Sequence, residues 1–287
     1  MQAETVTPPA GTVGLCTSDL VLIPKDDHWL ALNKANWHLV GHAKVHSSGQ
    51  LEQVLINPPC RRQGFASQIR RAFPEPITVD TARLTDDAKA WLKHLGWDEK
   101  IGGLPRAANL DFSLIQRRRA DHWTQRLKIP ADYSQSRKLP LVAEPARLQC
   151  LGTDTQGRAI YLTPKASQAW ADMKQAAANQ GITLEPVSGF RSIAYQGKLV
   201  SAKIAAGIPM DSILSVSAAP GYSEHHSGAA LDLCTPGSAP LEACFADTPA
   251  FTWLSEQAQR WDFVMSYPPD NPHRLAFEPW HWCFRGG

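Results

Sequence analysis

Residues 220–233 read Pro-Gly-Tyr-Ser-Glu-His-His-Ser-Gly-Ala-Ala-Leu-Asp-Leu, and they contain two potential metal ligands, His225 and Asp232. Gly228 and the two alanines after it allow a tight turn into a strand. That strand can return Asp232 to the side of His225. His281 offers a third ligand from a separate segment. Catalytic zinc takes three nitrogen or oxygen ligands and keeps an open position for water, so these side chains predict a zinc site.

The residue best placed to act on a zinc-bound water is Glu278, three residues before His281. Zinc lowers the pKa of its bound water toward about 7 and polarises a carbonyl group. A carboxylate that accepts the proton of this water completes what peptide hydrolysis needs. Any one of these residues alone is more typical of a surface or capping position, but their combination favours a metallopeptidase.

Three stretches match the motifs of one family in that family's order. Residues 223–232 fit S-x-H-x-x-G-x-A-x-D, residues 278–281 fit E-x-W-H, and residues 188–196 resemble S-G-Y/F-R-S-x-x-x-Q. Together they resemble the VanY-type D-alanyl-D-alanine carboxypeptidase family of zinc peptidases. The resemblance extends over residues 128–287.

This resemblance implies that His225, Asp232 and His281 bind zinc. It implies that Glu278 is the general base and then the proton donor to the leaving amine. It makes Arg191 a catalytic and substrate-binding residue, because a guanidinium can donate two hydrogen bonds to developing or fixed negative charge. A purely structural Arg–carboxylate pair is the alternative for Arg191.

Two further residues are implied to bind substrate: Gln196, five residues after Arg191, and Ser223, two residues before His225. His226 has no place in the motif, and we predict that it is incidental to the chemistry. The alternative for His226 is support of the metal ligands through a hydrogen bond.

Residues 61–66, Arg-Arg-Gln-Gly-Phe-Ala, fit R-x-x-G-x-G/A, and residues 88–97 resemble A-x-x-F-Y-x-x-x-G-F. Both elements resemble the acyl-CoA-binding core of the GCN5-related N-acetyltransferases. The resemblance implies CoA binding at Arg61–Ala66, where backbone N–H groups at a helix N-terminus hold the pyrophosphate. Leu92 replaces that family's acidic Tyr and cannot donate a proton. We therefore predict a degenerate, non-catalytic domain, with an active acetyltransferase as the alternative.

The length of 287 residues and a break in composition predict two domains. We expect residues 1–118 to form a mixed α/β domain and residues 136–287 to form an α+β domain with a small antiparallel sheet flanked by helices. The two resemblances imply that the first is acetyltransferase-like and the second is a zinc peptidase. The charged and Pro-punctuated stretch 119–135 is predicted to be a linker, either wholly irregular or with a short helix in it. Within the domains we expect strands at 29–32, 37–40, 50–56, 77–80 and 182–188, and helices at 63–73, 85–94, 164–179 and 193–206.

Composition excludes several classes of protein. The 29 Lys and Arg residues against 27 Asp and Glu give a net charge of +2, which lacks the basic excess of a nucleic-acid binder. No apolar run reaches the length of about 18 residues that a membrane span needs. Six cysteines without a C-x-x-C pair predict free, buried thiols. The sequence does not predict an oligomeric state.

The predicted substrate is a muropeptide or a peptidoglycan stem peptide, and two specificities fit it. The first residues carry no basic segment followed by an apolar one, so we expect a cytoplasmic location. A D,D-carboxypeptidase there would attack the pentapeptide precursor of the cell itself. An L,D-carboxypeptidase would instead trim tetrapeptides to tripeptides in peptidoglycan recycling, and this is our prediction. A non-catalytic muropeptide-binding protein is the alternative from another functional class.

Overall fold

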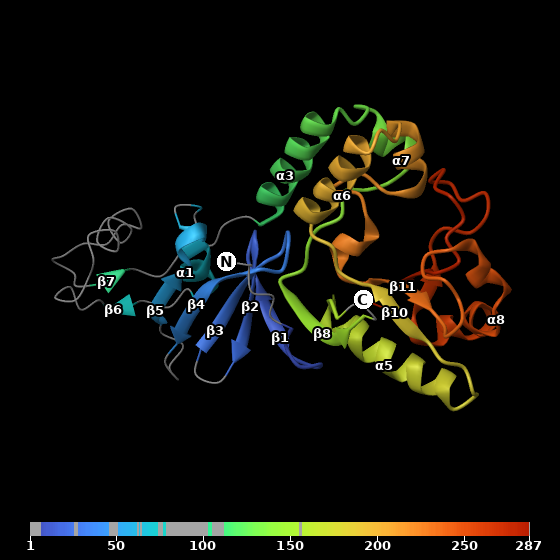
Figure 1. Cartoon of the computed structure of the whole chain (residues 1–287), viewed down its shortest axis with the longest axis horizontal. Helices are drawn as coiled ribbons and strands as arrows, with labels where there is room; N and C mark the ends of the chain where they lie inside the picture. Colours follow the sequence, from blue (N-terminus) through green and yellow to red (C-terminus); the bar gives the residue numbers. More distant parts are fainter. Residues whose placement is uncertain are drawn as a thin grey trace. The chain divides into compact units, whose positions relative to one another are not determined.

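The computed structural model describes residues 7–25, 28–45, 51–61, 63, 65–73, 77–78, 103–104, 112–154 and 157–286. It separates into two compact units, and Figure 1 colours the chain by residue number. Unit 1 comprises Met1–Val6 and Gly14–Phe112. Unit 2 comprises Thr7–Val13 and Ser113–Gly287.

Unit 1 contains an antiparallel sheet with the strand order β5-β4-β3-β2-β1. Helix α1 (Phe65–Ala72) buries Phe65 and Ile69 in a core shared with Leu20 and Leu22 of the sheet. The strands are β1 (Val13–Cys16), β2 (Leu20–Lys25), β3 (His28–Asn33), β4 (Leu39–Val45) and β5 (Leu51–Ile56), and a further pair consists of β6 (Ile77–Thr78) and β7 (Gly103–Leu104).

The described part of unit 1 matches several expected elements. The expected strand at 29–32 is β3, and the expected strand at 50–56 and the helix at 63–73 are β5 and α1. The strand expected at 37–40 begins at Leu39 instead. Residues 85–94 and 88–97 lie outside the described residues, so the acetyltransferase-like character of this unit stays a prediction.

The stretch 119–135 lies inside unit 2 rather than between two units. It holds most of α3 (Phe112–Leu127) and the start of α4 (Tyr133–Arg137). Leu127 and Tyr133 are buried in a core with residues of α6 and α7. Arg117 and Arg118, just before this stretch, are exposed on α3. The charge run thus marks one side of an amphipathic helix.

The centre of unit 2 is a four-stranded antiparallel sheet in the order β10-β11-β13-β12. Its strands are β10 (Glu185–Ser188), β11 (Ala230–Cys234), β12 (Phe263–Met265) and β13 (His281–Phe284). Asp232 of β11 stands opposite His281 of β13 and also opposite Ser188 of β10. The small antiparallel sheet that the sequence predicts is therefore present, and its register brings two potential metal ligands together.

Helix α5 (Pro164–Ala178) covers this sheet through a helical stripe of buried residues. Thr163 caps the helix, since its side chain accepts a hydrogen bond from the Ala166 N–H, and Pro164 fits the first turn. The core around it includes Leu231 and Leu233 of the sheet and residues of α8 (Pro249–Gln257). The buried stripe of α5 consists of Ala166, Trp170, Met173 and Ala177.

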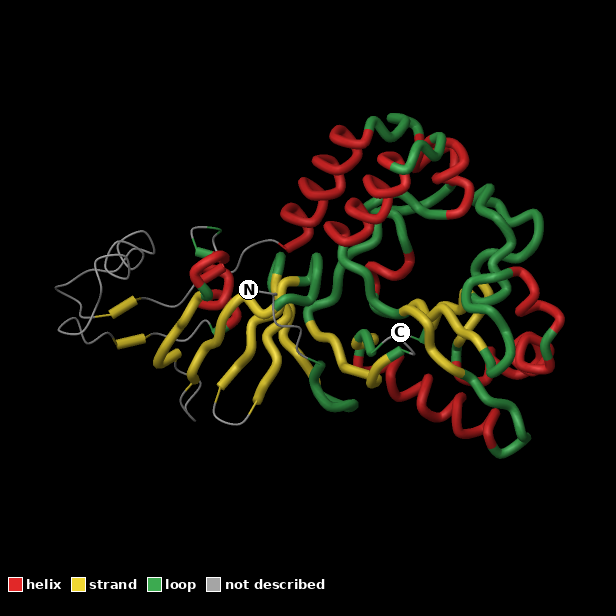
Figure 2. The backbone as a smooth tube through the Cα atoms, viewed as in Figure 1, coloured by secondary structure: helices red, strands yellow, loops and turns green. Residues whose placement is uncertain are grey.

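A second core joins four helices of unit 2. Helices α6 (Ile193–Ala205) and α7 (Met210–Val216) share it with α3 and α4, and Figure 2 shows these helices grouped together. Gly197 permits the close approach of α6 to α3, because a Cβ atom there would overlap the ring of Trp123. The hairpin of β8 (Arg147–Thr153) and β9 (Ala159–Leu162) leads into α5.

Two compositional predictions can be compared with this fold. All six cysteines are free thiols, and Cys16, Cys150, Cys234 and Cys283 are buried. The prediction of burial is wrong for Cys244, which is exposed. Among the described residues, the helices are too short or too polar to cross a bilayer.

Candidate active site

Three buried side chains of unit 2 form a candidate metal site. One ligand atom each from His225, Asp232 and His281 lies within 4.8 Å of the others. Asp232 and His281 face each other through the register of β11 and β13. His225 comes from the short 3-10 helix Glu224–Ser227, which ends at Gly228 in the left-handed conformation, at φ 65°. The turn that the sequence predicts at Gly228 is the one that returns Asp232 to His225.

The ring of His225 is oriented for a metal. Its Nδ1–H donates to the Gly189 carbonyl oxygen at 2.6 Å. Its Nε2 is buried, has no hydrogen-bond partner among the described residues, and lies 3.2 Å from Asp232 Oδ2. Burial and the nearby Arg191 cation lower the pKa of His225 to about 4. The ring is therefore neutral near pH 7 and presents a free nitrogen lone pair, as metal ligation requires.

His281 lies between two carboxylates. Its Nδ1 is 3.0 Å from Asp232 Oδ1, and its Nε2 is 3.0 Å from Glu224 Oε2. Burial opposes a charge on this ring, but the two carboxylates outweigh it and raise the pKa of His281 to about 10. His281 and Asp232 are two of the residues that would hold a divalent cation, and the cation would compete with a proton for the ring, because metal ligation needs a nitrogen without its proton. The Nε2–H would remain held by Glu224.

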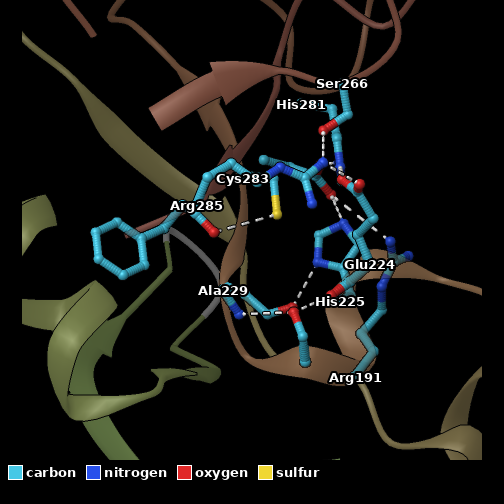
Figure 3. A network of polar contacts seen from close by, with 12 residues as sticks. Arg191, Glu224, His225, Ala229, Ser266, His281, Cys283 and Arg285 are labelled. Atoms are coloured by element: carbon cyan, nitrogen blue, oxygen red, sulfur yellow. Dashed lines mark hydrogen bonds and ion pairs between the residues drawn. The ribbon is translucent and has the colours of Figure 1, made fainter. Parts of the chain in front are cut away.

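The sequence motif does not single out Glu224, yet this carboxylate has a defined place in the structure. It accepts a hydrogen bond from Arg285 at 2.5 Å as well as the one from His281, and Figure 3 shows it between these two side chains. Burial opposes its ionisation, but the contacts with His281, Ser266 and Arg285 prevail and hold the pKa of Glu224 well below its usual range. The one sequence signal that could have identified Glu224 is that it directly precedes the potential ligand His225.

A cavity of about 310 Å³ opens beside the three potential ligands. Glu278, Gln196 and Ser223 all line it, as the motifs predict. Burial and the nearby Asp232 raise the pKa of Glu278 to about 7, against the opposing fields of His281, Arg191 and Lys203. A carboxylate with a pKa near neutrality is suited to accept a proton and later to return it.

Arg191 is placed to meet a ligand in this cavity rather than to form a tight structural ion pair. Its Nη2 is 3.9 Å from Asp232 Oδ2, which exceeds hydrogen-bonding distance. Its Nε is buried and has no hydrogen-bond partner in the described part of the chain. Two cavity residues are also structural. Gln196 donates from Nε2 to the Ala218 carbonyl at 2.8 Å, and Ser223 is buried.

His226 supports the loop that carries the first ligand. Its Nε2 accepts a hydrogen bond from the Gly221 N–H at 3.0 Å, and its Nδ1–H donates to the Arg191 carbonyl at 2.6 Å. The side chain is fully buried. It therefore fixes the backbone of Arg191 against the loop before His225, so it is more than the incidental residue that the sequence predicts.

Comparison with known proteins bears on this geometry. The model of the VanY family, described as D-alanyl-D-alanine carboxypeptidase, matches residues 159–287. The match supports the resemblance drawn from the motifs over these residues, which include the three potential ligands, Glu278 and Arg191.

Curated relatives match part of the chain. The putative carboxypeptidase YodJ of Bacillus subtilis is 29% identical over 129 residues, which is 44% of this chain and 47% of that protein. A D-alanyl-D-alanine carboxypeptidase of Enterococcus faecium is 29% identical over 125 residues, which is 42% of this chain and 37% of that protein. The chain thus spans less than half the length of these curated relatives.

Two solved structures are similar to part of this chain. The LD-carboxypeptidase LdcB is 26% identical with a TM-score of 0.42, covering 51% of this chain and 66% of that chain. A vancomycin-resistance D,D-pentapeptidase VanY in complex with Zn(II) is 26% identical with a TM-score of 0.41, covering 52% of this chain and 89% of that chain.

Proposed function

We propose that the chain is a zinc-dependent carboxypeptidase that removes the terminal D-Ala from peptidoglycan stem peptides. One observation carries the proposal: His225, Asp232 and His281 converge at the edge of a cavity that Glu278 also lines. Two imidazoles and one carboxylate with space beside them fit catalytic zinc. The VanY-family match and the carboxypeptidase relatives support the same reaction.

The residues of the chain divide the chemistry between them. Zinc held by the three ligands would polarise the scissile carbonyl and acidify a water. Glu278 takes the proton of the attacking water and delivers it to the leaving amine of D-Ala. Arg191 donates hydrogen bonds to the substrate oxygen as negative charge develops on it. Burial of the site strengthens each of these interactions.

The narrower proposal is L,D specificity in cytoplasmic peptidoglycan recycling. Its support is an argument from compartment. In the cytoplasm, removal of D-Ala from tetrapeptides yields reusable tripeptides, whereas D,D activity would consume the pentapeptide precursor. Cell fractionation tests the location, and recovery of the protein outside the cytoplasm would withdraw that support.

The direct test is mass spectrometry of the zinc-loaded full chain incubated separately with tetrapeptide and pentapeptide muropeptides. We expect loss of one alanine from the tetrapeptide, almost none with Glu278→Gln, and no metal retained by His225→Ala. Loss from the pentapeptide alone would make the enzyme a D,D-carboxypeptidase. Binding without turnover by the zinc-loaded protein would favour the non-catalytic muropeptide-binding alternative.

We propose that the peptidase domain predicted at 136–287 extends back to Ser113, where the second segment of unit 2 begins, and that the acetyltransferase-like domain before it is non-catalytic. The strand–helix order of β5 and α1 around Arg61–Ala66 is compatible with the CoA-binding element that the sequence predicts. Calorimetric titration of the full chain with acetyl-CoA tests that element. Absence of binding would remove the CoA prediction, and acetyl transfer to an amine would contradict the non-catalytic assignment.

A further inference from the structure

A second cation shares the candidate active-site cavity with Arg191. Lys203 of α6 lines this cavity, and its ammonium donates a hydrogen bond to Ser217 Oγ at 2.7 Å. Ser217 follows directly after α7 and lines the same cavity. The motifs assign no role to either residue. The contact holds one N–H of the ammonium and orients the charged group within the cavity.

The charges around this cavity favour an anionic ligand. Arg191 and Lys203 are cationic, and Asp232 and Glu278 are the facing carboxylates. A divalent metal at the candidate site would leave a net positive charge. Burial and the Arg191 cation both lower the pKa of Lys203, with Glu278 acting against them. Arg191 and Lys203 line one partly desolvated cavity, where a bound carboxylate would relieve the repulsion between their like charges.

The two cations have different surroundings, which gives them different tasks. Arg191 lies beside the metal ligand Asp232, at 3.9 Å, where the scissile carbonyl would be activated. Lys203 is anchored by Ser217, next to the small apolar wall of Val216 and Ala218. In a peptide cut at its last bond, the terminal carboxylate lies about one residue, roughly 3.5 Å, beyond the scissile carbonyl. The methyl group of a terminal alanine fits a wall of small apolar side chains.

We propose that Lys203, oriented by Ser217, binds the C-terminal carboxylate of the peptide and thereby confines the site to the last peptide bond. This inference rests on the proposed carboxypeptidase function and adds its specificity determinant. Arg191 is then reserved for the scissile carbonyl. A chain-internal bond offers Lys203 no carboxylate, so it leaves this partly buried cation without its ligand.

The test measures binding and turnover separately. Zinc-loaded full chain carrying Glu278→Gln is titrated calorimetrically with stem tetrapeptide and pentapeptide, each as the free acid and as the C-terminal carboxamide. For the stem peptide that binds, we expect the free acid to bind about 10- to 100-fold more tightly than the carboxamide. The carboxamide loses a hydrogen bond between two charged groups. Adding Lys203→Met should reduce this ratio to near one, and Lys203→Arg should retain part of it.

Lys198→Met is the matched control, because Lys198 lies on the exposed face of the same helix. It should leave the ratio of acid to carboxamide binding unchanged. Zinc content and melting temperature verify that each variant is folded and loaded. An unchanged ratio in folded Lys203→Met would overturn the inference, whether or not the enzyme turns over. Turnover of the otherwise wild-type chain tests the proposed function independently, through release of D-Ala from the free acids.

Discussion

Replacement of Glu224 by alanine should weaken zinc binding without removing any of the three potential ligands. Glu224 Oε2 lies 3.0 Å from His281 Nε2, and the Glu224 side chain is only 16% exposed, so solvent screens the contact weakly. Its loss frees the His281 ring to rotate and makes the ring less basic. We expect the dissociation constant for zinc to rise in Glu224→Ala.

Two estimates of the size of this effect agree. A hydrogen bond to a charged group contributes about 1.5–3 kcal/mol, which corresponds to about 10- to 150-fold in affinity. Carboxylates behind a metal-binding histidine contribute about 10- to 100-fold in metal affinity. Glu224→Gln keeps an oxygen acceptor for His281 Nε2–H but loses the charge. Because a neutral hydrogen bond has about half the strength of a charged one, this variant should lose roughly 3- to 10-fold.

The assay is competition for zinc between the full chain and a chromophoric chelator at fixed pH. Glu256→Ala is the control, because Glu256 is an exposed carboxylate on α8. Arg285→Gln should change the zinc affinity by only a few-fold, since Arg285 is 51% exposed and its pair with Glu224 is screened. Wild-type zinc affinity in folded Glu224→Ala would refute the assignment of Glu224 as the residue that positions His281.

Three more outcomes follow from the structure. Gly197→Ala should lower the free energy of unfolding by about 1–3 kcal/mol through overlap with Trp123, measured by urea titration, and a more stable variant would contradict the close packing of α3 on α6. The rate constant kcat/KM should fall as the pH drops below about 7, because Glu278 must be ionised to accept a proton and its pKa is raised to about 7. A bound divalent cation stabilises the ionised form of Glu278 and therefore moves the midpoint of this pH profile to lower pH. If the residual activity of Glu278→Gln showed the same fall in kcat/KM at low pH, the titration would belong to another group. Dialysis against a strong chelator should abolish turnover and zinc should restore it, whereas full activity of chelated protein would exclude the metal mechanism.

The sequence predicts the parts of this site that are encoded by neighbouring residues. His225, Gly228 and Asp232 stand in one short motif because a tight turn and one strand are enough to bring them together. The position of Asp232 opposite His281 depends on strand pairing across 49 residues, and here the family motif supplied what spacing alone could not. The motif also identified Glu278, which lines the cavity as expected.

The residues that the sequence missed act through tertiary contacts. Glu224 and Arg285 meet only in the folded chain, and neither belongs to a spacing that indicates metal chemistry. Helix α6 carries two lysines, Lys198 on its exposed face and Lys203 in the cavity. The residue type alone does not tell which of the two faces the cavity. The linker prediction missed the packing of α3 for a similar reason. The charged and polar residues of 119–135 suggested an exposed connection, whereas Leu127 and Tyr133 are buried in a core with α6 and α7.

The geometry of the metal site depends on strand register more than on the ligands alone. A slip of one residue between β11 and β13 would turn Asp232 to the opposite face of the sheet, because side chains alternate along a strand. The register is supported on both sides of Asp232, by pairing with Ser188 and with His281. The aligned site therefore depends on the pairing of β10, β11 and β13, and the buried core beneath the sheet stabilises the arrangement of ligands that zinc would complete.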